Sequence, residues 1–467
     1  MTISEAPTIN HDSTADSNSS YTSFTTIATA PISLDIIIVG AGLGGLTAAI
    51  GLTLAGHNVT VLEQAAELGE VGAGIQIPPP SSKILKTIGC LDSVLSKAIL
   101  PYDFKIFSWK SGNLISEQNL IPYVKDQYHG EYIHVHRADY HRVLVERCEE
   151  LNVKVLLNSR VDHIDFDSNT VTTSTRISYT GDIIVGYDGI KSELRSFILG
   201  YPDLPYNTGD LAYRALIDVE EMKKYDELKF LYEKPNINFW WGPQSHIVVY
   251  LLQGGKTCNV VILSPDNLEP GVFVEHSSKE ELTELFKDWD PRLIKLFELI
   301  HSTSKWKLQN SRELSTWTHK SSNCIILGDA SHATLPYLAS GASSALEDAA
   351  VLTGLLSHIE SKDQIHPILE LTESLRKWRS TQIVKGSTQC QNIYHLKDGQ
   401  DQLIRDSKLA DLPPKIGYPN RWADPSFQQF LWGYEAFDEA ERGWKEFKKG
   451  NHSVKYHFDN LYEDSKL

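Results

Sequence analysis

The stretch at residues 35–63, DIIIVGAGLGGLTAAIGLTLAGHNVTVLE, decides the fold of this chain. Residues 36–39 form a short apolar run of β-branched side chains, which is typical of a buried parallel strand. Apolar residues then recur at helical spacing from Leu46 to Leu54, and residues 58–62 have the pattern of a second strand. The sequence therefore predicts a strand, a glycine turn, a helix and a strand, which together make a βαβ unit.

Gly40, Gly42 and Gly45 form a GxGxxG turn between the first strand and the helix. In a dinucleotide-binding unit these glycines make the tight turn, let a pyrophosphate approach the backbone and allow close helix packing. Glu63 ends the second strand about 20 residues further on, where a carboxylate accepts hydrogen bonds from a ribose diol. Because an acidic residue there disfavours a 2′-phosphate, the unit is predicted to bind the ADP part of FAD or NAD.

A membrane span is the alternative for residues 34–56, which are almost free of charge and contain a GxxxG pair at Gly40 and Gly44. The glycines that interrupt this stretch and the strand-like run at its start disfavour that alternative. The formal net charge of −16 disfavours nucleic acid and anionic lipid as partners. Composition is otherwise ordinary, with 41% hydrophobic and 22% charged residues, as in a folded, water-soluble protein.

The five cysteines lie far apart and form no CxxC pair, which predicts neither a disulfide framework nor a zinc site. Residues 1–33 are rich in Ser and Thr and lack Lys and Arg, which disfavours a secretory signal or a transit peptide. We therefore expect a disordered extension at residues 1–33 and a cytoplasmic protein. His134 and His136 are interpreted as solvent-facing side chains, because no third metal ligand is in sight and no metal site is predicted.

The 467-residue chain is long enough for two domains and a helical tail. Residues 102–120 are predicted to form a hairpin that turns at Ser111 and Gly112. Residues 228–263 contain three β-rich runs separated by Pro or Gly, which predicts an antiparallel meander as the wall of the second domain. Beyond Ala345 the pattern is mostly helical.

Further along the chain, an apolar strand runs into GDASHATLPYLASGASSALEDAAVL at residues 328–352. This stretch resembles the GD box of the FAD-dependent group A aromatic hydroxylases, especially their salicylate-hydroxylase-like branch of fungal type. In that family the Asp contacts the flavin ribityl chain, and the following helix points its N-terminus at the isoalloxazine. By resemblance these roles fall on Asp329, Gly341 and Ala342. A helix N-terminus also stabilises negative charge on a reduced flavin.

Shorter motifs extend the resemblance. GYDGIKSELR at residues 186–195 resembles the family's DG motif through Asp188, and this motif is thought to serve both pyrophosphate and nicotinamide use. GEVGAGIQI resembles the segment that would place Ala73 and Gly74 beside the flavin, and in HVHRADYH the resemblance makes Arg137 the flavin-contacting arginine.

The resemblance covers roughly residues 34–444, since FLWGYEAFDEAERGW near the C-terminus is also similar to the tail of the salicylate-hydroxylase-like branch. Two positions depart from the family pattern. Ser340 stands where many relatives carry Gln, and Ala333 stands where Pro is common. A hydrogen bond near the flavin edge is therefore expected to be lost or replaced.

The resemblance implies an α/β fold with a Rossmann-like FAD-binding domain (GR2-type), an antiparallel-sheet substrate domain and a helical C-terminal region. The expected boundaries are 34–205 and 306–365 for the FAD-binding domain, 206–305 for the substrate domain and 366–467 for the helical region. The implied activity is that of a monooxygenase in which FAD, reduced by NAD(P)H, reacts with O2 to a C4a-hydroperoxide that hydroxylates a phenolic or salicylate-like ring.

Such a reaction needs a dry pocket, a group that favours the phenolate and an anchor for a carboxylate. Arg214 in AYRALID and Tyr250 in HIVVYLL are polar residues within apolar β-rich runs. Our hypothesis is that Arg214 binds the substrate anion and Tyr250 orients or deprotonates the phenol. The alternative is an Arg paired with a surface carboxylate and a Tyr in the core. His246, Trp240 and Trp241 are candidates for lining the same pocket, although tryptophans are also ordinary core residues.

Two other classes of protein stay open at this point. An FAD-dependent isomerase or cyclase without net redox change could keep the GxGxxG turn and the GD box. A non-enzymatic membrane-bound or interaction protein would need the apolar stretch to span lipid. The sequence leaves open the aromatic substrate, decarboxylative hydroxylation against hydroxylation of a polyketide in secondary metabolism, NADH against NADPH, and a monomer against a homodimer.

Overall fold

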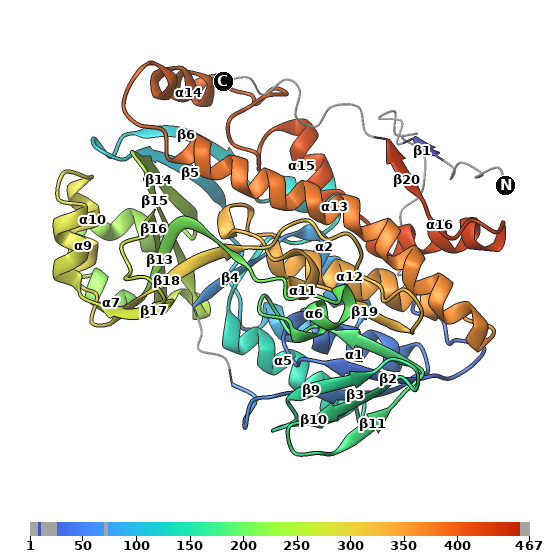
Figure 1. The fold of residues 1–467 in the computed structure, drawn as a ribbon. Coiled ribbons are helices and arrows are strands. Elements are labelled where there is room, and N and C mark those ends of the chain that lie inside the picture. Colours follow the sequence, from blue (N-terminus) through green and yellow to red (C-terminus); the bar gives the residue numbers. More distant parts are fainter. Residues whose placement is uncertain (1–7, 11–25, 70–72, 458–467) are drawn as a thin grey trace.

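Two β-sheet units joined by long helices make up the structure, a computed structural model that describes residues 8–10, 26–69 and 73–457 (Figure 1). The first unit is built on a five-stranded parallel sheet with the order β19-β12-β2-β3-β8. The second is an eight-stranded sheet with the order β17-β18-β13-β16-β15-β14-β5-β6. Helix α13 (Ile365–Tyr394) crosses both units, since its first half packs in the core of the first unit and its second half in the core of the second.

The predicted βαβ unit is confirmed as β2, helix α1 (Leu43–Leu54) and β3. The apolar side chains of this stretch are buried, so the residues considered as a membrane span form the core of the first unit. In the part of the chain that the structure describes, no helix is long and apolar enough to cross a membrane. The strands of the parallel sheet are β2 (Asp35–Val39), β3 (Asn58–Leu62), β8 (Lys154–Leu156), β12 (Ile183–Gly186) and β19 (Cys324–Ile326).

The predicted meander is present as the antiparallel neighbours β14, β15 and β16, although residues 229–232 form a short helix rather than part of the first run. The predicted hairpin is β5 and β6, and it joins this second sheet although its residues fall in the range expected for the FAD-binding domain. Because β5 pairs parallel with β14, the sheet is not purely antiparallel. Its strands are β5 (Asp103–Ser108), β6 (Leu114–Asn119), β13 (Tyr206–Asp218), β14 (Ile237–Gly242), β15 (Ser245–Leu252), β16 (Thr257–Pro265), β17 (Val274–Ser277) and β18 (Thr303–Asn310).

The two faces of the eight-stranded sheet are both buried, and side chains alternate between them along each strand. The outer face packs against a group of short helices, namely α7 (Val219–Met222), α8 (Lys229–Tyr232), α9 (Lys279–Leu285) and α10 (Pro291–Glu298). The inner face packs against the loop after the GD turn and against the C-terminal helices through Tyr337, Tyr394 and Trp422. The inner face is therefore the one turned toward the first unit.

Smaller sheets and helices complete the structure. The small sheets consist of β1 (Thr8–Asn10) with β20 (Lys455–His457), β4 (Gly74–Ile77) with β7 (Ile133–His136), and β9 (Val161–Asp165), β10 (Thr170–Thr173) and β11 (Ser178–Thr180). The other α-helices are α2 (Pro79–Thr87), α3 (Leu91–Leu95), α4 (Tyr123–Tyr128), α5 (Arg137–Glu150), α6 (Glu193–Leu199), α11 (Asp329–His332), α12 (Gly341–Leu356), α14 (Gln400–Ala410), α15 (Pro425–Trp432) and α16 (Ala436–Lys448). The 3-10 helices are η1 (Asp226–Leu228), η2 (Gln253–Gly255), η3 (Pro336–Leu338) and η4 (Lys362–Gln364).

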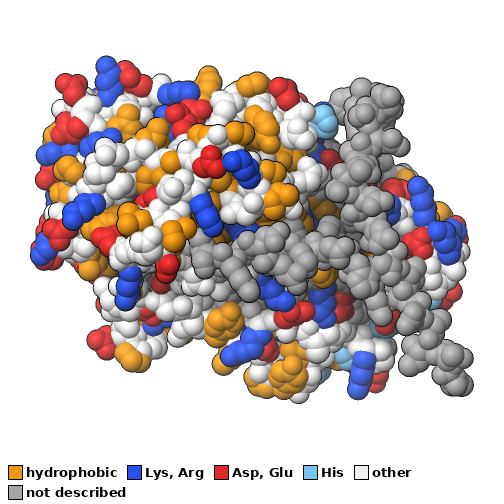
Figure 2. All heavy atoms as spheres, turned by 90° about the horizontal axis from the view of Figure 1, so that it is seen from above, with side chains coloured by type: hydrophobic (Ala, Val, Ile, Leu, Met, Phe, Trp, Pro, Cys, Tyr) orange, Lys and Arg blue, Asp and Glu red, His pale blue; other side chains and the backbone are white. Residues whose placement is uncertain are grey.

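The N-terminal extension is described in part. Residues 1–7 and 11–25 lie outside the described residues, so the expected disorder there has no structural counterpart to compare. Ile27, Ala30 and Ile32 pack against the core of the first unit, so this part of the predicted extension is ordered. The predicted helical region after residue 366 is confirmed in α13 to α16. On the face seen in Figure 2, Lys and Arg side chains are interspersed with Asp and Glu, so the net negative charge does not gather there as one acidic patch.

Candidate active site

The glycine turn after β2 has the geometry that its sequence pattern predicts. Gly40 has a φ of +108°, and a Cβ there would collide with the carbonyl oxygen of Tyr187. A Cβ at Gly45 would collide with the carbonyl oxygen of Gly40. A Cβ at Gly42, in contrast, would meet no described atom within 4 Å, and Gly42 begins α1 without a side-chain cap. The turn therefore opens at its middle glycine, where a phosphate could approach the amide groups of a helix N-terminus.

Glu63 is held beside this turn. Its Oε2 accepts a hydrogen bond from the Ala41 amide at 2.8 Å, and its Oε1 accepts one from the Ala65 amide at 2.8 Å. Each carboxylate oxygen keeps a further acceptor position for a ribose hydroxyl. His141 lies on the other side of the turn, with Nε2 2.8 Å from the carbonyl oxygen of Ala41. Sequence reasoning missed His141, although it is the last residue of the HVHRADYH motif.

Asp188 follows β12 at the same edge of the parallel sheet. Its Oδ2 accepts hydrogen bonds from the amides of Glu193 and Leu194 at 2.9 and 3.1 Å, so it caps the start of α6. Its Oδ1 is buried and has no hydrogen-bond partner among the described residues, and burial raises the pKa of this carboxyl. Arg195 links the DG motif to the GD box, because its guanidinium donates to the carbonyl oxygen of Ala330 at 3.1 Å.

The GD box lies between β19 and α12. Asp329 is exposed at the first position of α11, after a glycine with positive φ. Gly341 and Ala342 are the first residues of α12, and no side chain caps this helix. The Ser340 side chain does not cap the helix, because its hydroxyl donates to the carbonyl oxygen of Leu338 at 2.8 Å. The N-terminal amides of α12 are therefore open to a ligand.

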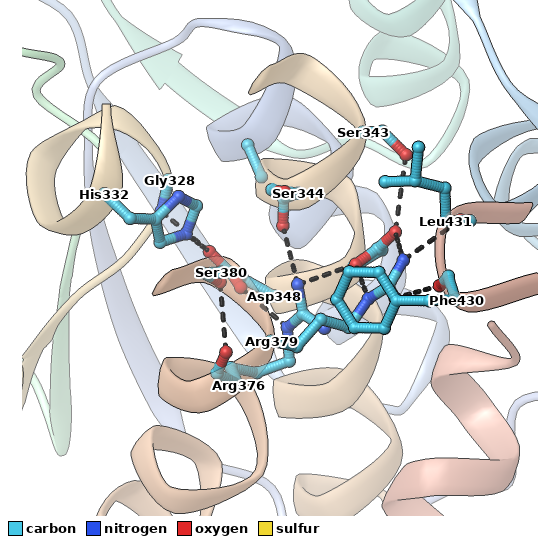
Figure 3. Close-up of polar contacts among 12 residues, drawn as sticks. Gly328, His332, Ser343, Ser344, Asp348, Arg376, Arg379, Ser380, Phe430 and Leu431 are labelled. Atoms are coloured by element: carbon cyan, nitrogen blue, oxygen red, sulfur yellow. Dashed lines mark hydrogen bonds and ion pairs between the residues drawn. The ribbon is translucent and has the colours of Figure 1, made fainter. Parts of the chain in front are cut away.

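A buried ion cluster lies beneath the GD box, and sequence reasoning missed it (Figure 3). Glu347 Oε2 of α12 lies 2.7 Å from Arg376 and 2.8 Å from Arg379, both of α13. Asp348 Oδ1 lies 2.8 Å from Arg376 Nε. Burial alone would raise the pKa values of both carboxyls, but the guanidinium groups, with His332 beside Asp348, outweigh it and lower them. The cluster joins two helices through two carboxylates and two guanidinium groups.

The same cluster reaches the GD turn itself. Asp348 Oδ2 accepts a hydrogen bond from the Gly328 amide at 2.9 Å and lies 2.6 Å from His332 Nε2. Both contacts appear in Figure 3 beside the pair of arginines. Asp348 of the ion cluster therefore holds the turn that carries Asp329 in place. A signal in the sequence was the adjacent Glu347 and Asp348 in an otherwise apolar helix.

Arg214 and Tyr250 both belong to the inner face of the eight-stranded sheet. Arg214 pairs across the sheet with Val261, and Val261 pairs with Val248. Tyr250 lies two residues beyond Val248 on the same strand, and residues two apart point to the same side. The structure therefore brings together on one face the two residues singled out as substrate-binding candidates.

The surroundings of these two residues are those of a cleft. Arg214 is solvent-accessible, yet burial lowers the pKa of its guanidinium, Tyr250 counteracts the shift and Arg137 adds to it. A side chain that is accessible and also surrounded by protein lines an internal cleft. Tyr250 packs so closely on β4 that a Cβ at Gly74 would lie 2.6 Å from its hydroxyl oxygen. The Arg137 amide donates to the Ala73 carbonyl oxygen at 3.1 Å, and the Gly74 amide donates to Asn259 Oδ1 of β16 at 2.9 Å, so these three FAD-contact candidates are tied to the sheet.

The two tryptophans considered as pocket-lining residues lie on opposite faces of the sheet. Trp240 lies on the outer face, where its Nε1 donates to Asp290 at 2.8 Å, so it cannot line a pocket with Arg214. Trp241 lies on the inner face and stacks on Tyr394 with ring centroids 4.1 Å apart. The two adjacent tryptophans face opposite ways because strand side chains alternate.

The expectation of a solvent-facing His134 is wrong. Its side chain is fully buried, with its ring centroid 4.3 Å from that of Tyr250. Burial lowers the pKa of His134 to about 3, so the ring is neutral at physiological pH. Among the described residues there is no group of three or more His, Cys, Asp or Glu side chains arranged to hold a metal ion.

A separate cavity of about 680 Å³ lies between α13 and the chain that follows β18. It touches Ser331 and His332 of the GD box but none of the predicted site residues. It is therefore distinct from the cleft lined by Arg214. Its lining includes Tyr206, Arg312, Trp317, Lys385 and Gln389.

Several known proteins are similar to this chain over most of its length. Residues 33–387 match a family described as an FAD binding domain. The FAD-dependent monooxygenase OpS4 of Beauveria bassiana is 35% identical over 414 residues, which cover 87% of this chain and 96% of that protein. The 3-hydroxybenzoate 6-hydroxylase of Polaromonas naphthalenivorans is 30% identical over 391 residues, covering 83% and 94%. A solved substrate complex of salicylate hydroxylase has the same fold, with a TM-score of 0.74 at 21% identity, covering 88% and 98%.

Proposed function

The chain belongs to the family of FAD-dependent monooxygenases with an FAD binding domain, and on that basis we propose that it hydroxylates a phenolic or salicylate-like aromatic compound with NAD(P)H and O2. The observation that carries the proposal is the pair Arg214 and Tyr250 on one sheet face, with Tyr250 packed directly on Gly74. The pair combines a cation and a phenol in a cleft, which suits an aromatic substrate with an acidic group.

The residues at the parallel-sheet edge fit FAD. The open side of Gly42 and the uncapped start of α1 suit its pyrophosphate, and the buried, unpartnered Oδ1 of Asp188 suits a polar ligand group nearby. The uncapped start of α12 suits the negative charge of a reduced flavin ring. We assign FAD contacts to Gly40, Gly42, Gly45, Glu63, Ala73, Gly74, Arg137, Asp188, Asp329, Gly341 and Ala342.

Bound FAD, reduced by NAD(P)H, supplies the activated oxygen that enters the ring. The role of Arg214 is to hold the anionic group of the substrate, either a phenolate or a carboxylate, through charge-assisted hydrogen bonds. Exclusion of water by the bound aromatic ring and the apolar residues of the inner face favours transfer of oxygen to the ring over release of hydrogen peroxide.

The role of Tyr250 is orientation rather than deprotonation. Burial raises the pKa of its hydroxyl, and this outweighs the opposing effects of Arg214 and Gln76. Tyr250 is therefore a neutral phenol at physiological pH, able to donate or accept one hydrogen bond but unable to act as a base. Of the two roles that the sequence left open for Tyr250, the electrostatics favour the first.

The test is oxygen uptake and NAD(P)H oxidation by the purified, FAD-loaded protein with a panel of phenols, salicylates and resorcinols, in the presence of catalase. Stimulation by one class of ring, together with a hydroxylated product, supports the proposal. An FAD-dependent isomerase would bind FAD and an aromatic ligand but show no ligand-stimulated NAD(P)H oxidation.

Arg214→Ala is expected to lower kcat/KM for the active aromatic by about 10- to 100-fold, the size of a lost hydrogen bond to a charged group. The absorbance of bound FAD is expected to stay unchanged. Arg160→Ala is the matched control, because Arg160 is an exposed arginine paired with Glu193 at the surface. Equal kinetics of the Arg214 and Arg160 variants would remove Arg214 from the substrate site.

A further inference from the structure

Three side chains connect the inner sheet face to the end of α13. His246 Nδ1 lies 2.8 Å from His395 Nε2, and His395 Nδ1 lies 3.5 Å from Asp210 Oδ2. His246 and Asp210 belong to the same inner face as Arg214, as the pairing of β13, β16 and β15 shows. We call Asp210, His395 and His246 the histidine chain.

The histidine chain runs outward from the interior. His246 is 2% exposed and is surrounded by the rings of Phe239, Tyr337 and Tyr394. The side chains of Asp210 and His395 are each 9% exposed. The His246 end therefore lies deeper on the sheet face that it shares with Arg214, and the Asp210 and His395 end lies nearer the surface.

The carboxylate near His395 sets the direction of the hydrogen bond between His395 and His246. Asp210 Oδ2 accepts from the Tyr337 hydroxyl and from Gln391 Nε2 at 2.7 Å, so it acts as an acceptor. A proton on His395 Nδ1 then faces Asp210, which leaves Nε2 of His395 as an acceptor for Nδ1–H of His246. In this arrangement Nε2 of His246 carries a lone pair, and it has no hydrogen-bond partner in the described part of the chain.

We propose that the histidine chain removes the phenolic proton of the substrate and passes it to solvent, an inference that rests on the proposed hydroxylase function. The phenol O–H bond breaks and its proton binds His246 Nε2, while the Nδ1 proton of His246 moves to His395 Nε2. The Nδ1 proton of His395 leaves by way of Asp210 to water. No electron moves, and the substrate is left as the phenolate that reacts with the activated oxygen.

The neighbouring groups do not offer an alternative base. Burial raises the pKa values of Tyr337 and Tyr394, so both stay protonated. Arg405 stacks over Trp241 and carries a proton that it does not release at physiological pH. Burial lowers the pKa of His395 to about 3 and that of His246 well below its usual range, so both rings are neutral and able to accept a proton in passing.

The histidine chain affects how fast the bound phenol loses its proton. Arg214 affects how much of the bound phenol is ionised at equilibrium, so an experiment can separate the two roles. The probe is 4-nitrophenol, whose phenolate absorbs visible light, bound to the FAD-loaded protein. Binding is measured first by quenching of flavin fluorescence. A rapid upward pH jump on the complex is then followed at the phenolate band.

His395→Gln is expected to slow phenolate formation by about 100-fold, as for loss of a general base, with an unchanged final amplitude. Asp210→Asn is nearly isosteric and reverses the hydrogen-bond direction, so it should slow the step as well and serves if the His395 variant binds FAD poorly. Arg214→Ala should lower the amplitude instead. His276→Gln, at an exposed histidine of β17, is the control with wild-type rate and amplitude.

Wild-type rates in Asp210→Asn and in FAD-loaded His395→Gln would show that the histidine chain does not transfer the phenolic proton, and the hydroxylase proposal would still stand. Absence of 4-nitrophenol binding, together with no stimulation of oxygen uptake by any aromatic, would overturn both. A purely structural histidine chain would lower protein stability in these variants without slowing the pH-jump step.

Discussion

Helix α13 carries two buried polar clusters, and they differ in charge balance. Near its first half, Arg376 and Arg379 meet Glu347 and Asp348, so the ion cluster holds two positive and two negative groups (Figure 3). Near its end, His395 meets a carboxylate and a second neutral imidazole. In the first cluster the two guanidinium charges balance the two carboxylate charges. In the second cluster Nε2 of His246 has an acceptor position that no described residue fills.

The two clusters are therefore suited to different roles. The ion pairs of the first cluster join α12 to α13 and reach the Gly328 amide, so its role is to fix α12 and the GD turn at a defined position. The histidine chain holds two neutral imidazoles that can accept and donate protons. One helix thus combines a rigid anchor for the cofactor side with a reactive chain on the substrate side.

Removing one arginine from the ion cluster is expected to lower the stability of the protein more than any other change discussed below. Arg376→Met leaves Asp348 and Glu347 buried with one guanidinium group fewer, and breaking a buried pair costs about 3–5 kcal/mol. Urea unfolding of the FAD-loaded protein measures this as a lower midpoint. Lys385→Met is the control on the same helix, because Lys385 is exposed and lies 3.7 Å from an exposed Glu313.

For Lys385→Met a change of at most about 1 kcal/mol is expected, as for surface ion pairs. Similar midpoints for the two variants would mean that the buried Arg376 stabilises the protein no more than the exposed Lys385 does. The ion cluster would then have no special role in stabilising the fold.

Sequence alone could predict the local elements of this fold but not its buried charges. The βαβ unit and the hairpin at β5 and β6 depend on neighbouring residues, whose periodicity and turn residues are visible in the sequence. The pairing of Asp348 with Arg376 depends on how two helices pack, and no local pattern specifies it.

In the candidate site too, features of the backbone could be predicted from the sequence, whereas contacts between distant segments could not. The glycines of the GxGxxG turn act through the backbone, so their spacing predicts their geometry. The interpretation of His134 as solvent-facing rests on the lack of a third metal ligand, whereas its burial against Tyr250 is a tertiary feature that no local pattern specifies. The opposite faces of Trp240 and Trp241, in contrast, were predictable from strand alternation.

An intermediate effect is expected from pH. The two histidines of the chain are neutral in the folded state because burial lowers their pKa values, while in the unfolded chain their pKa is about 6.5. Below pH 6.5 the unfolded state binds protons that the folded state does not, so stability falls by about 1.4 kcal/mol per pH unit for each histidine. The ion cluster behaves differently, since its carboxyl pKa values are lowered and its contribution is lost only below about pH 4.

Unfolding of wild type and His395→Gln at pH 7.5 and 5.5, with FAD at a fixed concentration, tests this sign. Wild type should lose about 1.4 kcal/mol more than the variant over this interval, because His57 and His134 contribute equally to both. An equal loss would mean that His395 is already protonated beside Asp210 in the folded protein. The histidine chain would then be an ion pair, and the contrast with the ion cluster would disappear.

Tyr337→Phe is expected to change stability and rate least, and it tests whether the tyrosine or the imidazoles of the histidine chain transfer the proton. The variant removes the hydroxyl that donates to Asp210 Oδ2 and leaves Gln391 and His395 in place. Loss of one hydrogen bond should lower the free energy of unfolding by about 1 kcal/mol. Because this hydrogen bond lowers the pKa of Asp210, its removal makes the carboxylate a better acceptor for the His395 proton. The rate of phenolate formation should therefore stay within a few-fold of wild type in the pH-jump experiment. A loss of rate as large as that of His395→Gln would assign proton transfer to the tyrosine and not to the imidazoles.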